Sequence, residues 1–184
     1  AIYWYIPNRS ALIGEVIAAV LKDLVPEDTG DDWQGTLRAL FYNYRARIAQ
    51  HPNIAPMIGV QLVSNASINF TMIESIFNLL RTAGFSDEKL PAAFSAVIGT
   101  MVGYTTQEFA LVPSDDKDEW VDTMKSTLRD IDSQQFPITS ALMPRLANQA
   151  FILRWKNGAT APLDDGFELF IDAMIAGLEQ LAQR

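Results

Sequence analysis

Apolar residues recur at helical spacing along most of this chain. In the first stretch they fall three or four residues apart and share one helix face: Leu12, Ile13, Val16, Ile17, Val20 and Leu24. The next stretch repeats the pattern with Trp33, Leu37, Leu40, Phe41, Tyr44 and Ile48. No segment alternates apolar and polar residues convincingly enough to predict a half-buried strand. The pattern therefore predicts an all-α domain of about eight or nine helices.

Capping residues and helix breakers predict where these helices begin and end. Asn8 and Asp31 are suited to N-cap the first two helices, and the pair His51–Pro52 ends the second. Gly84 fits the left-handed position after a helix, and Phe85 can make the apolar contact that accompanies it. The expected helices cover residues 8–25, 31–50, 55–63, 64–83, 87–111, 114–135 and 164–183, with a shorter helix from Phe136 that Pro144 interrupts and a loop over 157–163.

The helix expected over 87–111 has two faces that are both poor in charge. One face carries small residues, namely Ala92, Ala96, Gly99, Gly103, Thr106 and Ala110. The opposite face carries large ones, namely Phe94, Val97, Ile98, Met101, Val102, Thr105 and Phe109. A helix that is apolar nearly all round is expected to be buried on both sides. The large face predicts a contact with the domain core. The small face predicts a close approach by a second helix, either from another copy or from the same chain.

The composition excludes several classes of protein. A hydrophobic content of 49% in 184 residues is enough for one folded domain and argues against disorder. The absence of Cys excludes disulfides and thiolate metal sites, and it fits a reducing, cytoplasmic location. No apolar run reaches the roughly 18 residues that a membrane span needs. The net charge of −8 argues against a large nucleic-acid surface on these residues.

The sequence lacks the motifs that carry most enzyme chemistry. It has a single His, no repeated Glu-x-x-His pair, no P-loop and no Gly-rich dinucleotide fingerprint. We therefore expect no enzyme activity, no cofactor and no metal. A small all-α enzyme, as a rival reading, would need ionisable residues clustered in a pocket. Its candidates are scattered along the chain: Arg45, His51, Glu74 and Glu108.

Four segments, in the same order along the chain, resemble the TetR family of transcriptional repressors. The opening IYWYIPNRSAL is similar to the end of the family's helix-turn-helix domain, where an aromatic run and a basic turn precede a linker helix. DDWQGTLRALFYNYRARIAQHP resembles the first helix of the tetracycline-repressor-type C-terminal domain. IESIFNLLRTAGFS followed by FSAVIGTMVGYTTQEFA resembles its middle, and FELFIDAMIAGLEQL resembles its last helix.

The resemblance implies a division of the chain into three parts. Residues 1–6 would be a remnant of the recognition helix, 7–26 the linker helix, and 27–184 an effector-binding and dimerisation domain. On this reading most of the helix-turn-helix domain precedes Ala1, either cleaved or unseen. The residues implied to contact DNA are Tyr3, Trp4, Tyr5 and Arg9.

The resemblance also implies a homodimer and a pocket for a small molecule. The long helix over 87–111 and the final helix would pack against their copies through Ala92, Ala96, Gly99, Gly103, Phe167, Phe170, Ile171, Met174 and Leu178. The effector pocket would lie inside each subunit, between the helices over 31–50, 54–63, 64–83 and 87–111. Its implied lining is Phe41, Tyr44, Arg45, Met57, Gln61, Asn65, Asn69, Met72, Ile73, Phe77, Thr100, Tyr104 and Gln107.

These implications lead to one expected function and one alternative. Leu40 and Ile76 stand where the family's polar contacts to tetracycline would be, and Met57 replaces a metal-associated His. We therefore expect a repressor that binds operator DNA as a homodimer and is released by a largely apolar or aromatic effector. The alternative is a helical dimerisation or protein-interaction module without a small-molecule site, which predicts a filled core.

Overall fold

A computed structural model describes residues 6, 8–26, 32–64, 69–113 and 117–183, with side chains omitted for 60–64. These residues form eight α-helices and a short 3-10 helix, and contain no strand, which confirms the all-α prediction. The elements in chain order are α1 (Arg9–Val20), α2 (Trp33–Gln50), η2 (Pro52–Ile54), α3 (Ala55–Ser64), α4 (Phe70–Thr82), α5 (Leu90–Glu108), α6 (Lys117–Arg129), α7 (Pro137–Leu146) and α8 (Asp164–Ala182).

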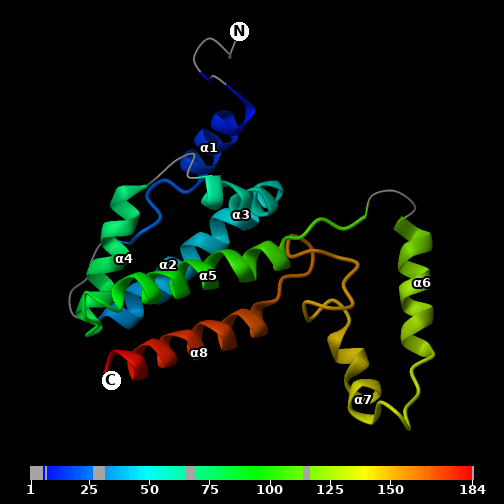
Figure 1. The fold of residues 1–184 in the computed structure, drawn as a ribbon. Helices are drawn as coiled ribbons and strands as arrows, with labels where there is room; N and C mark the ends of the chain where they lie inside the picture. The colour runs from blue at the N-terminus through cyan, green and yellow to red at the C-terminus, as the bar shows by residue number, and fades with distance from the viewer. Residues whose placement is uncertain (1–5, 7, 27–31, 65–68, 114–116, 184) are drawn as a thin grey trace.

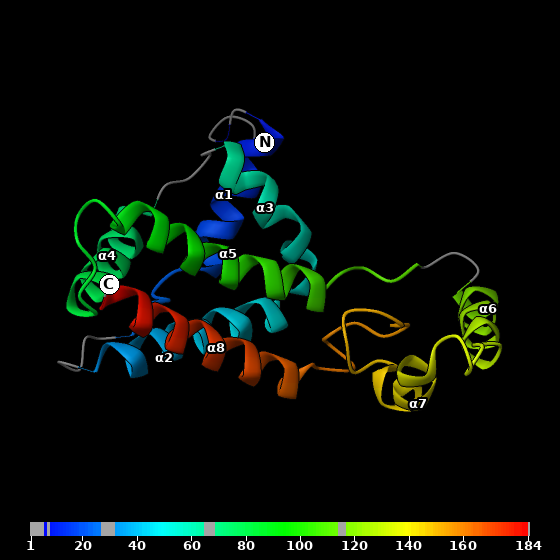
Figure 2. The ribbon, with the colours of Figure 1, turned by 60° about the horizontal axis from the view of Figure 1, so that its bottom comes forward.

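The body of the molecule is built around α5. This helix contacts α2, α3, α4 and α8, while α8 also packs along α2 and α1 packs on α3 (Figure 1). Figure 2 shows α8 running beside both α5 and α2. The core lies between these helices and includes the fully buried Leu40, Ile48, Ile76, Val97 and Ile171. Burial of each such side chain stabilises the folded state by about 1.5–3 kcal/mol, so the helices pack through the faces that carry the periodic apolar residues.

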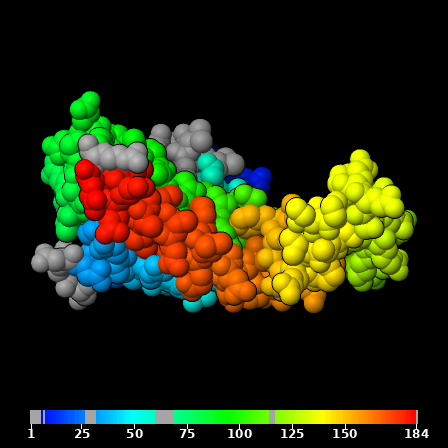
Figure 3. All heavy atoms as spheres, turned by 90° about the horizontal axis from the view of Figure 1, so that it is seen from below, coloured from blue at the N-terminus to red at the C-terminus, as the bar shows by residue number. Residues whose placement is uncertain are grey.

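Helices α6 and α7 form an arm at one end of the body, which Figure 3 shows as a separate lobe beside α8. Neither helix contains a buried residue. The apolar residues Trp120, Met124 and Leu128 of α6 are only half-buried, and so is Ile131, which lies beyond the end of the helix. The chain enters the arm after α5 and returns from it before α8, so both ends of the arm lie at the same end of the body.

Two local predictions at helix ends are confirmed. The side chain of Asn8 caps α1 by accepting a hydrogen bond from the Ala11 N–H at 2.8 Å. Gly84 has a φ of +105°, and the N–H of the next residue, Phe85, donates to the Leu80 carbonyl at 3.1 Å. Phe85 itself is buried. This closure satisfies a carbonyl that the end of α4 would otherwise leave without a partner.

Other predicted helix boundaries are wrong. α1 ends at Val20, not at residue 25, because the chain turns at Asp23, whose φ is +52°. The helix expected from 31 begins at Trp33, and Asp32 accepts the capping hydrogen bond from the Gly35 N–H. The helix expected over 64–83 begins only at Phe70. Asn69 is its N-cap and accepts a hydrogen bond from the Met72 N–H at 3.0 Å.

None of the helices in the described part of the chain is long and apolar enough to cross a membrane.

Candidate functional site

Four of the side chains predicted to line an effector pocket are buried in the core along α2 and α5. Phe41 and Tyr44 come from α2, and Thr100 and Tyr104 come from α5. Each exposes no more than 5% of its surface. The Thr100 hydroxyl donates to the Ala96 carbonyl of its own helix, so it is already satisfied. The structure therefore brings these four predicted residues into the interior, as packed core side chains.

Among them, the Tyr44 hydroxyl is buried and has no hydrogen-bond partner within the described part of the chain. Burial raises the pKa of this phenol to about 12, and the nearby Thr105 hydroxyl lowers it only in part. That Thr105 hydroxyl donates to the Met101 carbonyl at 2.8 Å. A polar atom left unpaired in a core normally costs stability, so a ligand that hydrogen-bonded to this hydroxyl would remove that cost.

Arg45, another predicted effector contact, is instead engaged by the protein itself. Its Nε donates to one oxygen of Glu108 at 2.8 Å, and one terminal nitrogen donates to the other oxygen at 2.6 Å. The second terminal nitrogen lies 2.8 Å from Asp164, and the guanidinium stacks over the Phe167 ring with its carbon 4.5 Å from the centroid. Its donors therefore hold carboxylates of α5 and α8, and its contact with an effector stays a prediction.

The carboxylates of Glu108 and Asp164 raise the pKa of the Arg45 guanidinium. Burial alone lowers the pKa of Arg45, but the hydrogen bonds and charges of Glu108 and Asp164 outweigh this effect and raise it. Glu108 has no exposed surface and also accepts the N–H of Leu163 at 2.9 Å. A groove of about 230 Å³ runs beside this ion pair. The arrangement satisfies both charges and leaves no unpaired carboxylate for acid–base chemistry.

The remaining predicted pocket residues lie in different surroundings. Met57 is exposed, and the Asn69 side chain caps α4. The half-buried Met72 and Phe77 pack against the core, with Phe77 against Phe94 at 5.0 Å between ring centroids, and Ile73 is half-buried too. The side chain of Gln61 and all of Asn65 lie outside the described residues.

An open cavity of about 580 Å³ lies between the end of α5, the start of α8 and the returning arm. It joins two residues predicted to bind ligand, Tyr104 and Gln107, with two predicted to form a dimer, Gly103 and Phe170. Sequence reasoning missed the other residues that line it: Gln149, Ala150, Phe151, Leu163, Gly166, Leu169 and Ala173. The first three belong to a segment without periodicity, so no pattern in the sequence could have placed them there.

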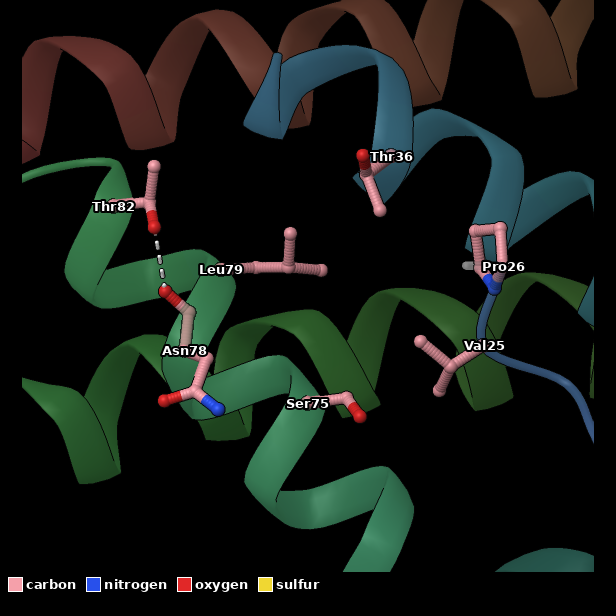
Figure 4. Close-up of a pocket in the computed structure, with 7 residues that line it drawn as sticks. All are labelled: Val25, Pro26, Thr36, Ser75, Asn78, Leu79 and Thr82. Carbon is pink, nitrogen blue, oxygen red and sulfur yellow. Dashed lines mark hydrogen bonds between the residues drawn. The ribbon is translucent and has the colours of Figure 1, made fainter. Parts of the chain in front are cut away.

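A second, smaller pocket of about 150 Å³ lies where the chain leaves α1 and meets α2 and α4 (Figure 4). Val25 and Pro26 form one wall, and Ser75 and Thr82 lie on α4 opposite. Both hydroxyls already donate to carbonyls of their own helix, Ser75 to Thr71 and Thr82 to Asn78. This volume is below the roughly 300 Å³ at which ligand pockets usually begin.

The predicted dimer residues divide into two groups. On α5, the stripe of Ala92, Ala96, Gly99 and Gly103 is exposed, and a Cβ added at either glycine would meet no atom within 4 Å. On α8, Phe170 is exposed and Met174 is half-buried. Phe167, Ile171 and Leu178 are buried in the core of their own subunit, so their assignment to a dimer face is corrected. The outward face of α8 is instead formed by Leu169, Phe170, Ala173 and Ala176.

Of the predicted DNA-contacting residues, the structure describes only Arg9. It is the first residue of α1 and is exposed, while Tyr3, Trp4 and Tyr5 lie outside the described residues. The ionisable residues of the rival enzyme reading do not gather in one site. Glu74 and His51 are exposed on separate elements, and Arg45 and Glu108 are paired. No group of metal-binding side chains occurs among the residues described.

Comparisons with known proteins agree with this architecture. The model of the family described as "Tetracyclin repressor-like, C-terminal domain" matches residues 25–182. No curated protein sequence matches the chain. Among solved structures, the transcriptional regulator SCO7222, a TetR from Streptomyces coelicolor, superposes with a TM-score of 0.70 at 23% identity, over 99% of this chain and 82% of that one. BioQ of Mycobacterium smegmatis superposes with a TM-score of 0.53 at 21% identity, over 95% and 78% of the two chains. The likeness to these two structures is one of fold. Together with the family match over most of its length, it shows that this chain belongs to the tetracycline-repressor-like C-terminal domain family of TetR regulators.

Proposed function

We propose that this chain is the effector-binding and dimerisation part of a cytoplasmic transcriptional regulator that binds operator DNA as a homodimer. The observation that carries the proposal is the unpartnered outer face of α5 and α8 in a chain of this family. Gly99 and Gly103 let a second backbone approach α5 closely, while the exposed Leu169 and Phe170 on α8 offer apolar area. Paired with its copy around a two-fold axis, this face forms a four-helix contact.

The expected effector is small, uncharged and largely apolar. Its predicted place is inside the subunit, near the Tyr44 hydroxyl that lacks a partner. Binding there would shift α2 and α5 against α1, which leads toward the DNA-contacting end of the chain. A change in the separation of the two α1 helices would lower operator affinity by a coupling free energy of about 1–3 kcal/mol.

Sedimentation equilibrium of the chain and its Gly99→Glu variant tests the dimer. A stable interface buries at least about 1,000 Å² in total, and a glutamate at its centre would bring two like charges together without partners. We expect the wild-type chain to be a dimer at micromolar concentration and the variant to be a monomer. Ala19→Glu, a similar change at an exposed alanine of α1, serves as the control and should stay dimeric. A wild-type monomer, or a dimeric Gly99→Glu variant, would overturn the proposed interface.

Arg9 offers a test of the DNA-binding part of the proposal. In the form of the protein that binds operator, Arg9→Ala should weaken binding about equally for operator and for unrelated DNA, because a phosphate contact carries no base information. Fluorescence anisotropy with both duplexes measures this, and an unchanged affinity would remove Arg9 from the DNA contact.

A dimerisation module without a small-molecule site remains the second candidate function. The packing of Phe41, Tyr44 and Thr100 in the core favours it. This alternative would be wrong if a small molecule released the protein from operator DNA and also raised the melting temperature of the chain.

A further inference from the structure

The cavity between α5, α8 and the returning arm has walls of a particular chemistry. Three aromatic rings meet there: Tyr104 and Phe170 are nearly parallel, with centroids 5.4 Å apart and planes 26° apart. Phe151 from the arm meets the Tyr104 ring edge-on, with centroids 4.7 Å apart. Phe151 and Phe170 are partly exposed, at 42% and 37% of their surfaces. Grouped, exposed aromatic side chains around a hollow are typical of ligand sites and not of ordinary surface.

None of the side chains that line this cavity carries a charge, although the chain as a whole has a net charge of −8. The Tyr104 hydroxyl donates to the Leu163 carbonyl at 2.9 Å, so the phenol is neutral and satisfied. The side-chain amides of Gln107 and Gln149 are further polar groups on the lining, and each can both donate and accept hydrogen bonds. A charged ligand would lose its hydration here without gaining a counter-charge, whereas a neutral one with a hydrogen-bonding group would not.

The size of the cavity also points to a small molecule. Its volume of about 580 Å³ lies within the range of roughly 300–1,000 Å³ that is common for ligand pockets. Gly103 adds to this space, because no atom lies within 4 Å of where its Cβ would be. On one side the cavity adjoins the outward face of α5 and α8, so a second copy packed on that face would border it.

We propose that this cavity is a ligand site for a flat, uncharged aromatic compound that bears one hydrogen-bonding group. The ring system stacks on Phe151 and Phe170, and the amides of Gln107 and Gln149 hold the polar group. This cavity shares Tyr104 and Gln107 with the effector lining expected from the sequence, but it lies apart from the Tyr44 hydroxyl, and the inference rests on the proposed function only for the position of the second copy.

The test uses the neutral fluorescent probe N-phenyl-1-naphthylamine, titrated into the 184-residue chain and followed by its emission. We expect saturable binding of one probe molecule per subunit. Ala173→Phe places a ring in the cavity and should weaken probe binding by more than about tenfold. Ala176→Phe changes another exposed alanine on the same face of α8, outside the cavity lining, and should bind as the wild type does.

Competition with naphthalene and 2-naphthol tests the role of the amides. The two compounds share a ring system, but 2-naphthol adds one hydroxyl. It should compete roughly threefold to tenfold better, the increment of one net hydrogen bond. In a Gln107→Leu, Gln149→Leu double variant this advantage should disappear while naphthalene still competes.

Several outcomes would overturn the inference. Equal loss of probe binding in Ala173→Phe and Ala176→Phe would assign the probe to the dimer face in general. If both variants bound the probe as tightly as the wild type does, the probe would lie elsewhere, such as the interior, and the proposed function would be unaffected. Probe binding that weakens as the dimer forms would assign the cavity to side chains of the second copy. The dimer itself is measured separately by sedimentation, so the two proposals fail independently.

Discussion

Arg45 on α2 and Glu108 at the end of α5 form a two-point ion pair whose carboxylate is completely buried. The same residue, Glu108, accepts the N–H of Leu163 with its side chain and the N–H of Gly158 with its carbonyl, at 2.9 and 2.7 Å. Gly158 lies so close that a Cβ there would sit 2.5 Å from Cγ of Glu108. This ion pair therefore fixes the point at which the arm returns to the body and α8 begins.

Replacing Arg45 by Met should destabilise the fold by about 3–5 kcal/mol, because it leaves a buried carboxylate without its cation. Urea unfolding followed by circular dichroism measures the difference. Arg38→Met is the matched control: Arg38 also lies on α2 and pairs with acids of α8, but Asp172 and Glu168 are exposed. Its loss should cost less than about 1 kcal/mol. Equal effects of the two variants would contradict the role given to the Glu108 pair.

Two buried tyrosines should respond oppositely to loss of their hydroxyls. Tyr44→Phe removes a hydroxyl that has no partner, so stability should be unchanged or slightly higher. Tyr104→Phe removes the hydrogen bond to the Leu163 carbonyl and should cost about 0.5–1.5 kcal/mol. Thermal and urea unfolding of both variants provide the comparison. A marked loss in Tyr44→Phe would mean that its hydroxyl is hydrogen-bonded in solution.

Gly84 and Gly59 should respond in opposite directions when each is replaced by alanine. Because φ at Gly84 is +105°, an alanine there should cost about 1–2 kcal/mol of stability. No atom of the described residues lies within 4 Å of a Cβ added at Gly59, inside α3, so Gly59→Ala should instead stabilise the fold by about 0.5–1 kcal/mol through helix propensity. Opposite signs in paired urea titrations are the expected result, and destabilisation by both would show that the space near Gly59 is filled.

The sequence rules that succeeded are those that depend only on nearby residues. The C-terminal closure at Gly84 and the cap at Asn8 involve atoms within five residues of each other, so composition and spacing predict them. The prediction of one helix over 64–83 is wrong because the apolar pattern does not reveal a helix start inside it. The Asn69 side chain accepts a hydrogen bond from a backbone N–H and so caps a new helix that begins at Phe70.

The periodicity of apolar residues does not show whether an apolar helix face is covered by the same chain or by a second copy. Phe167, Ile171 and Leu178 lie at helical spacing, as a dimer face would, but α2 and α5 of the same subunit cover them. A buried position has the same sequence signature whether its neighbour belongs to one chain or to two. The aromatic cavity was likewise hidden, because Phe151 reaches Tyr104 from a segment without regular structure.

Tyr44 and Tyr104 make the stability of the fold sensitive to alkaline pH. Burial, chiefly, raises the pKa of both Tyr44 and Tyr104 to about 12, with the charge of Glu108 adding to the effect at Tyr104. An unfolded tyrosine ionises near pH 10, so unfolding becomes favoured once the unfolded side chains can lose protons that the folded ones retain. The stability contributed by these groups is therefore complete below about pH 10 and is lost as the pH rises toward 12.

The free energy of unfolding, measured in urea at several pH values, should fall over this window, and tyrosinate absorbance should show late ionisation of the buried pair. Tyr44→Phe should make the decline shallower, because it removes one of the two groups. A decline of unchanged slope in that variant would show that Tyr44 ionises as an exposed tyrosine does.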